Sequence, residues 1–321
     1  MLMKPSSLSF IMMMLLGTLI SISATSWFPI WLGMEMNIIG FIPLIINKKN
    51  ILTSESALSY FTIQSVSSSA LLLFSIQNNF FMLSTDIITI ALLTKLGAAP
   101  FHFWVPSITE NISWNMMTLL LTWQKFAPLM ILNIHNKMSN LIMLTLISSA
   151  IWGSLGGLFQ TSTSKMLAFS SIAHMGWLIS ATMCSTNMVM MYFLIYSLSL
   201  IFASMTMKSL KMNSINSTLF TTKKNKILIY TLMLNMGGMP PLLGFFPKLM
   251  VLSMLLKLDW MILSMILIMS AMMNLFFYIR LSYVALMLNS FSKKNIFQIS
   301  SSYSPYFIII LLSGPVINMF Y

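Results

Sequence analysis

Apolar runs of about 20 residues follow one another along the chain, separated by short polar breaks. The hydrocarbon core of a bilayer accommodates about 20 apolar residues per helix, so each run predicts a membrane-spanning helix. We therefore expect an all-α, polytopic membrane protein that forms a single integral-membrane domain over residues 1–321. The pattern predicts eleven spans, at about 7–25, 29–46, 57–76, 82–105, 114–134, 141–160, 166–184, 188–207, 227–256, 260–286 and 303–320.

Lysine residues divide unevenly between the alternating loops that these spans create. The side with few lysines receives only Lys137 and Lys257. The positive-inside rule places the lysine-rich loops, and with them the N-terminus, on the positive side of the membrane. An odd number of spans then places the C-terminus opposite. The lysine-rich side receives Lys4, Lys48, Lys49, Lys208, Lys211, Lys223, Lys224, Lys226, Lys293 and Lys294.

Composition agrees with a membrane protein and excludes several other classes. The chain is 58% hydrophobic and only 7% charged, whereas about a quarter of the residues in a soluble domain are charged. The net charge of +12 comes from lysines that flank spans, so it does not indicate nucleic-acid binding. A single cysteine excludes an internal disulfide and a four-cysteine iron–sulfur site within this chain.

Four ionisable residues lie deep inside predicted spans: Glu35, Lys95, Lys125 and Lys248. Each costs roughly 2.5–3.5 kcal/mol at the centre of a membrane helix, or about 10 kcal/mol for the set. Such residues face a bundle interior or water, and a functional role is the default interpretation. The alternative is a buried ion pair that fixes helix packing. Asp86 starts the fourth span, where a carboxylate suits a helix N-terminus; a role in a channel is the alternative.

Glycine and proline interrupt the spans that carry Lys95 and Lys248. Proline removes a backbone donor, and loosened backbone at membrane depth is tolerated only beside protein or water. Each interrupted span is the fourth of five, which is typical of inverted-repeat transporters. We therefore expect repeat one at about 7–134, repeat two at about 141–286 and a final helix at about 303–320. The predicted break residues are Gly97, Pro100, Gly237, Gly238, Pro240 and Pro241.

Five motifs along the chain resemble the NADH–ubiquinone oxidoreductase chain 2 family, the mitochondrially encoded, antiporter-like membrane subunits of respiratory complex I. The 34 methionines fit a mitochondrial genome that reads an extra codon as methionine, and the sequence resembles an arthropod version. The motifs are WLGMEMN at 31–37, LLTKLGAAPFHFW at 92–104, TWQKFAP at 122–128, SSIAHMGW at 170–177 and GGMPPLLGFFPK at 237–248.

The resemblance implies a fold related to Mrp-type antiporter subunits, in the mitochondrial inner membrane, with two inverted five-helix repeats. It implies that Glu35 and Lys95 form the ion pair of the first repeat, Lys125 is the central connector and Lys248 is the terminal lysine. It implies no cofactor or metal in this chain, because NADH, FMN, iron–sulfur clusters and ubiquinone belong to partner subunits. The implied partners are other membrane-arm and accessory subunits and membrane lipids, with cardiolipin as one candidate, and no nucleic acid.

Two histidines, His102 after the first break and His174 within the seventh span, are weaker candidates for the same path. Histidine can relay protons near neutral pH, and the alternative for each is a hydrogen-bonded packing role. We therefore expect proton translocation through a buried Glu/Lys axis, driven by electron transfer in partner subunits. One alternative is an autonomous Na⁺/H⁺ antiporter, which needs more central carboxylates than Glu35. Another is a structural scaffold, in which apolar replacement of the central lysines is harmless.

Overall fold

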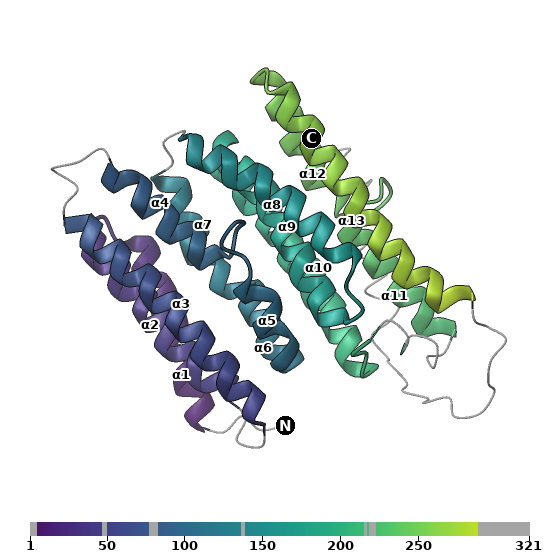
Figure 1. Ribbon diagram of the computed structural model, residues 1–321, viewed down its shortest axis with the longest axis horizontal. Helices are drawn as coiled ribbons and strands as arrows, with labels where there is room; N and C mark the ends of the chain where they lie inside the picture. Colours follow the sequence, from purple (N-terminus) through teal and green to yellow (C-terminus); the bar gives the residue numbers. More distant parts are fainter. Residues whose placement is uncertain are drawn as a thin grey trace. The chain divides into compact units, whose positions relative to one another are not determined.

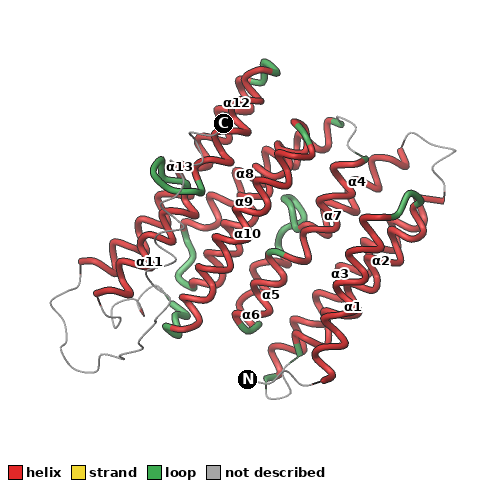
Figure 2. The backbone as a smooth tube through the Cα atoms, turned by 180° about the vertical axis from the view of Figure 1, so that it is seen from behind, coloured by secondary structure: helices red, strands yellow, loops and turns green. Residues whose placement is uncertain are grey.

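The computed structural model of the protein describes residues 5–46, 50–76, 83–135, 139–214, 217 and 223–287. In these ranges every regular element is a helix, apart from an isolated β-bridge between Ser162 and Ser214. Figures 1 and 2 show the course of the helices along the chain. They are α1 (Pro5–Ser23), α2 (Trp27–Ile45), α3 (Ile51–Ile76), α4 (Leu83–Leu96), α5 (Trp104–Asn111), α6 (Trp114–Leu121), α7 (Trp123–Ile134), α8 (Asn140–Leu158), α9 (Thr163–Cys184), α10 (Thr186–Ser209), α11 (Lys223–Gly237), α12 (Phe245–Lys257) and α13 (Met261–Met287).

The all-α membrane fold is confirmed. Every predicted span from 7–25 to 260–286 coincides with a helix or with two consecutive helices. Seven of the spans in the described part of the chain are long and apolar enough to cross a membrane as one continuous stretch. The predicted span 303–320 lies outside the described residues, so the count of eleven stays a prediction.

The chain forms two compact units, Met1–Leu146 and Ile147–Tyr321. In the first unit α1 packs closely against α2 because two glycines face each other. A Cβ on Gly17 would lie 2.6 Å from the carbonyl oxygen of Gly33, and a Cβ on Gly33 would lie 2.5 Å from that of Gly17. Small residues let helix backbones approach in this way. Helix α3 packs against α2 and α4, and α4 packs against α7.

In the second unit α9 is the most buried of the long helices and packs against α10, α12 and α13. The C-terminal end of helix α8 is bonded by an arginine side chain from α13. Arg280 donates from Nη1 to the carbonyl oxygen of Leu158 at 2.5 Å and from Nη2 to that of Gln160 at 2.8 Å. Helix C-termini carry unpaired carbonyl groups and a partial negative charge, so Arg280 stabilises this end.

Helix α4 ends at Leu96 because Gly97 adopts a left-handed conformation, with φ at 67°. The Gly97 amide bonds to the carbonyl of Thr94 at 3.1 Å, and the Ala98 amide bonds to that of Leu93 at 3.1 Å. These two bonds form a Schellman motif, the common glycine-dependent helix ending. The chain then turns through residues 97–103 before α5 begins.

Helix α11 ends at Gly237 in the same way. Gly238 has φ at 81°, and its amide bonds to the carbonyl of Asn235 at 3.1 Å. The Met239 amide bonds to the carbonyl of Leu234 at 3.2 Å, which completes a second Schellman motif. Each unit therefore contains one span that is split into two half-helices, α4–α5 and α11–α12, by the same backbone device.

Candidate functional site

Glu35, near the middle of α2, is held by α3. The hydroxyl of Ser68 donates a hydrogen bond to Glu35 Oε1, and it also lies 2.9 Å from the carbonyl oxygen of Ser65. Glu35 is partly buried. Its carboxylate interacts electrostatically with the ammonium of Lys95, but the two groups form no direct hydrogen bond. In this arrangement Ser68, and not Lys95, is the hydrogen-bond partner of Glu35.

Lys95 occupies the last turn of α4 and is only 5% exposed. Its Nζ makes no hydrogen bond to any side chain or backbone group in the described part of the chain. The Lys95 carbonyl accepts a hydrogen bond from Gln64 Nε2 of α3 at 3.5 Å. The partial negative charge of a helix C-terminus favours a cation in this turn. The break after Leu96 therefore supplies part of the stabilisation that a buried ammonium needs.

Buried amides connect the helices that carry Glu35 and Lys125. Gln124 Nε2 on α7 donates to Asn37 Oδ1 on α2 at 3.1 Å, and the Tyr60 hydroxyl on α3 donates to Gln124 Oε1 at 3.1 Å. Asn37 lies two residues after Glu35, and Gln124 directly precedes Lys125. This network fixes α2, α3 and α7 around the two ionisable residues.

Lys125 is buried in α7, shortly after a local irregularity. Helix α6 ends at Leu121, and Thr122 leaves ideal helical geometry with φ −113° and ψ −77°. Pro128 lacks the amide that would bond to the carbonyl of Gln124. The backbone is thus loosened on both sides of Lys125, a feature that the sequence signals only through Pro128.

Lys248 lies in the first turn and a half of α12 and is buried. Its Nζ donates to the carbonyl oxygen of Gly237, the last residue of α11, at 2.8 Å. The same nitrogen lies 5.9 Å from the ring centroid of Trp177 on α9, within the range of a cation–π interaction. Asn235 Oδ1 accepts from the Gly244 amide at 2.9 Å, which ties the start of α12 to α11.

Each broken span therefore brings one ammonium to the C-terminal end of its first half-helix. The two lysines are not equivalent in sequence, because Lys95 precedes Gly97 by two residues and Lys248 follows Gly238 by ten. What they share is the helix end, whose carbonyl groups and partial negative charge stabilise a cation.

The two histidines have different surroundings. On α9, Nδ1 of His174 shares a hydrogen bond of 2.9 Å with the hydroxyl of Tyr192 on α10, and the ring lies 5.0 Å from that of Tyr196. His102 is buried in the loop of the first break, and its ring stacks on that of Phe103 with the ring centroids 4.4 Å apart. Both histidines are therefore well packed, and a relay role for either stays a prediction.

The sequence analysis missed the polar side chains around the ionisable residues, namely Asn37, Tyr60, Gln64, Ser68 and Gln124. Asparagine and glutamine inside an apolar span are the available signal, because an unpaired amide in hydrocarbon is costly. Within the described residues, no three His, Cys, Asp or Glu side chains gather as metal ligands would.

Comparison with known proteins identifies the family of the chain. Residues 24–274 match the family model described as NADH:quinone oxidoreductase/Mrp antiporter, TM. The chain is 42% identical to NADH-ubiquinone oxidoreductase chain 2 of Anopheles gambiae, over 99% of this chain and 98% of the relative. It is 37% identical to the protein of the same name from Locusta migratoria, over 88% of this chain and 85% of that one.

Solved structures show the same fold at low sequence identity. A chain of respiratory complex I from Thermus thermophilus superposes with a TM-score of 0.84 and 18% identity, covering 98% of this chain and 77% of that one. A chain of the Mrp complex from Dietzia superposes with a TM-score of 0.72 and 12% identity, covering 89% of this chain and 61% of that one. The predicted relationship to antiporter-like subunits is therefore confirmed at the level of the fold.

Proposed function

Because the chain belongs to the NADH-ubiquinone oxidoreductase chain 2 family, we propose that it is a proton-translocating subunit in the membrane arm of respiratory complex I. It lies in the mitochondrial inner membrane, with its N-terminus on the matrix side and its C-terminus in the intermembrane space. NADH, FMN, iron–sulfur clusters and ubiquinone are bound by partner subunits, which carry out the electron transfer. Other membrane-arm and accessory subunits are its neighbours, and cardiolipin is a candidate lipid.

One observation carries the proposal: Lys95, Lys125 and Lys248 are all buried in helices that are mostly apolar. Replacing each of them by leucine would remove a cost of roughly 2.5–3.5 kcal/mol. The chain instead keeps the charges and breaks two helices beside them. Titratable groups in such places mark ion pathways in membrane proteins.

The surroundings of Glu35 suggest how distant electron transfer can move a proton. When the Glu35 carboxylate approaches Lys95, the ammonium is stabilised and keeps its proton. When the carboxylate is held away, by Ser68 or by a charge in a neighbouring subunit, Lys95 can release that proton. Two unit charges 4 Å apart interact by about 4 kcal/mol at an effective dielectric constant of 20. Moving one charge against 100 mV costs about 2.3 kcal/mol. The change in interaction energy between Glu35 and Lys95 is therefore large enough to drive one proton across the membrane potential.

In this proposal the proton released near Lys95 reaches Lys125, which lies beside the network of Gln124 and Asn37, and then Lys248. Lys248 passes it to the intermembrane space. The hydrogen bond from Lys248 to Gly237 holds its ammonium at the second helix break between transfers. His174 and His102 are secondary candidates along this route.

An autonomous cation/proton antiporter is the second candidate, favoured by the structural similarity to the Mrp complex. A sodium site requires several oxygen ligands. In the part of the chain that the structure describes, Glu35 is the only carboxylate well inside a long helix. The antiporter hypothesis predicts that transport depends on sodium, whereas the complex I hypothesis predicts that it depends on NADH oxidation.

Lys248→Met in the assembled complex tests the proposal, with Lys257→Met on the same helix as the control. Lys257 is exposed, so its loss removes a charge without touching the buried path. We expect fewer protons pumped per NADH oxidised in Lys248→Met and an unchanged ratio in Lys257→Met, measured in inner-membrane vesicles. An unchanged ratio in both variants would support a structural scaffold and contradict the proposal.

A further inference from the structure

An apolar groove runs between α3 and α4 in the first unit. It has a volume of about 430 Å³ and is lined by residues drawn from 62–70 of α3 and 87–94 of α4. Val66, on the α3 side, is 69% exposed, so the groove opens on the surface of this unit. An open apolar groove in a membrane requires an occupant, because an unfilled wall loses its van der Waals contacts.

The hydroxyl groups in the lining are already used as donors. Each donates to the carbonyl oxygen three residues earlier in its own helix: Thr62 at 3.0 Å, Ser67 at 2.7 Å and Thr94 at 2.8 Å. The other lining residues are isoleucine, valine and alanine. The groove therefore offers no side-chain donor to a ligand, and a polar occupant would lose the hydrogen bonds that it makes to water.

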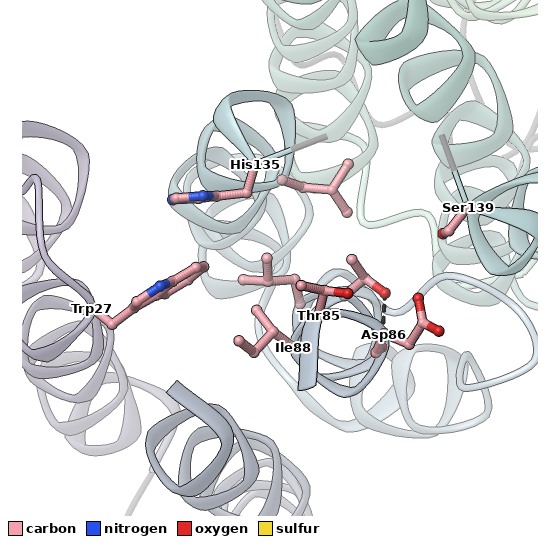
Figure 3. Close-up of a pocket in the computed structure, with 9 residues that line it drawn as sticks. Trp27, Thr85, Asp86, Ile88, His135 and Ser139 are labelled. Atoms are coloured by element: carbon pink, nitrogen blue, oxygen red, sulfur yellow. Dashed lines mark hydrogen bonds between the residues drawn. The ribbon is translucent and has the colours of Figure 1, made fainter. Parts of the chain in front are cut away.

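Another face of α4 lines a different kind of space. A cavity of about 180 Å³ there is lined by polar residues that include Asp86, His135 and Ser139 (Figure 3). None of the residues that line this cavity also lines the groove. Helix α4 therefore separates a polar cavity from an apolar groove, and its two faces can be compared in one experiment.

The dimensions of the groove fit a single hydrocarbon chain. At a rise of 1.5 Å per residue, the lining covers about 12 Å of α3 and about 10 Å of α4. Spread over that length, the volume of 430 Å³ corresponds to a mean width of about 7 Å. A helix with its side chains is about 10–12 Å across, whereas non-bonded carbon atoms touch at about 4 Å. One extended acyl chain therefore fits within the groove, and a partner helix does not.

The groove also has the depth of one lipid leaflet. Asp86, near the start of α4, directly precedes the first lining residue of this helix, and Thr94 is the last. Thr94 lies about 12 Å along the axis from Asp86, and the hydrocarbon of one leaflet is about 15 Å deep. By the lysine distribution, the start of α4 belongs to the side opposite the lysine-rich loops. The groove therefore runs from that surface towards the middle of the membrane, as a lipid tail does.

We propose that this groove binds one acyl chain of a phospholipid from the leaflet opposite the lysine-rich loops. The acyl chain enters beside Ala70 and Ile87 and ends beside Thr62 and Thr94. Two helices enclose it, whereas a lipid on a single exposed helix touches one wall only, so the groove retains its acyl chain longer than the bilayer retains its neighbours. The inference goes beyond the proposed proton path and depends only on the location of the protein in a membrane.

The bound acyl chain lies behind the candidate site. Ser67, in the lining, directly precedes Ser68, the hydrogen-bond donor to Glu35. Thr94, also in the lining, directly precedes Lys95. The acyl chain therefore supports, from the membrane side, the segments of α3 and α4 that carry these two residues.

Photolabelling of the assembled complex tests the acyl-chain site. The purified complex is placed in phosphatidylcholine vesicles that contain a phosphatidylcholine with a diazirine in one acyl chain. It is then extracted and washed in a mild detergent, which removes loosely held lipid, and irradiated, and labelled residues are located by mass spectrometry. Met269 on α13 is the control for surface lipid, because it is 69% exposed, as Val66 is. Thr89, on the cavity face of α4, is the control for the groove.

We expect the labelling of Val66 and Ile90 to survive the wash and to exceed that of Met269 at least several-fold, with Thr89 unlabelled. A diazirine near the end of the acyl chain should label the part of the groove at residues 62 and 94. A diazirine near the ester should label the part at residues 70 and 87.

A pair of tryptophan variants tests whether the groove itself holds the lipid. Val66→Trp fills the groove, and we expect it to lower the labelling of Ile90 several-fold. Leu73→Trp is the matched control, because Leu73 is 58% exposed, lies two turns further along the same face of α3 and does not line the groove. Labelling of Ile90 should be unchanged in Leu73→Trp.

Equal labelling of Ile90 and Met269 would mean that the groove meets bulk lipid only, and would overturn the site, as would an unlabelled Ile90. Labelling of Ile90 that excess ubiquinone removes and excess phosphatidylcholine does not would assign the groove to an isoprenoid tail instead. The reverse order of the two diazirine positions would contradict the leaflet. If Val66→Trp does not assemble, the comparison of Ile90 with Met269 in the unaltered complex decides.

Discussion

Lys248 Nζ donates a 2.8 Å hydrogen bond to the carbonyl oxygen of Gly237, the residue at which α11 ends. The bond joins the two half-helices of a broken span through the charge that the break accommodates. Lys95 lies in the last turn of its own helix, α4, and its Nζ makes no hydrogen bond in the described part of the chain. Both breaks therefore create a helix C-terminus, and both C-termini receive a buried ammonium.

The paired glycines at the second break provide the first prediction. A Cβ on Gly238 would lie 2.9 Å from Lys248 Nζ, at a residue whose φ is 81°. A Cβ on Gly237 would meet its nearest neighbour only at 3.5 Å. We expect Gly238→Ala to cost about 1–2 kcal/mol in backbone strain and to displace the ammonium. Gly237→Ala should be close to neutral, as judged by thermal stability and by protons pumped per NADH in the assembled complex.

Equal behaviour of these two alanine variants would contradict the account of the break. Reduced pumping in Gly237→Ala alone would show that the contact with Lys248 is not the sensitive element.

The Ser68–Glu35 hydrogen bond provides the second prediction. A hydrogen bond to a charged group contributes about 1.5–3 kcal/mol, so losing it shifts the position of Glu35 by roughly 10- to 100-fold in population. We expect Ser68→Ala to leave Glu35 beside Lys95, which then keeps its proton, and to lower NADH-driven pumping several-fold. Ser69→Ala is the matched control, because Ser69 is exposed and its hydroxyl donates to the carbonyl of Val66 in its own helix.

A pumping rate in Ser68→Ala equal to that in Ser69→Ala would show that Ser68 does not hold Glu35 in a functional position. Loss of the assembled complex in Ser68→Ala alone would assign the hydrogen bond to packing.

Much of the fold follows from the sequence because membrane helices obey a simple rule of length and apolarity. The boundaries of α2, α8 and α9 lie within a few residues of the predicted spans. The positions of glycine and proline in the sequence predicted both helix breaks. In the structure, Gly97 and Gly238 adopt the left-handed conformation that glycine permits. Helix α3 begins six residues earlier than predicted, because its first two turns are rich in serine and threonine and do not look apolar.

The site was less predictable than the helices. Charges inside spans identify Glu35, Lys95, Lys125 and Lys248, because their insertion cost is large. Which residues touch them depends on helix rotation and packing, which a single sequence does not specify. Ser68 shows the difficulty, because the chain has so many serines that none is informative alone. The irregularity at Thr122 is equally hidden, since threonine is common in helices of membrane proteins.

Orientation in the membrane provides the third prediction. Lys211, just after α10, belongs to a lysine-rich loop, and Lys257, at the end of α12, belongs to the opposite side. Both are exposed. In a Cys184→Ser background we expect Lys211→Cys to react with an impermeant thiol reagent only from the matrix side. Lys257→Cys should react only from the intermembrane space, measured in intact mitoplasts and in inverted vesicles.

Reaction of Lys211→Cys from the outer face of mitoplasts would reverse the proposed topology. Reaction of both positions from one side would mean that the number of spans between them is wrong.

The central claim is that the buried lysines carry protons. Lys125→Met tests it most directly, because methionine keeps the length and apolar bulk of the side chain and removes the titratable group. Lys125→Arg complements it, since arginine keeps the charge but holds its proton too firmly to relay it. Lys208→Met, at the exposed end of α10, is the control.

The decisive measurement is the number of protons pumped per NADH oxidised by the assembled complex in sealed vesicles. The account predicts a lower ratio in both Lys125 variants, or a parallel loss of NADH oxidation if the two steps are tightly coupled, with Lys208→Met unchanged. A normal ratio in Lys125→Met at a normal rate of NADH oxidation would contradict it.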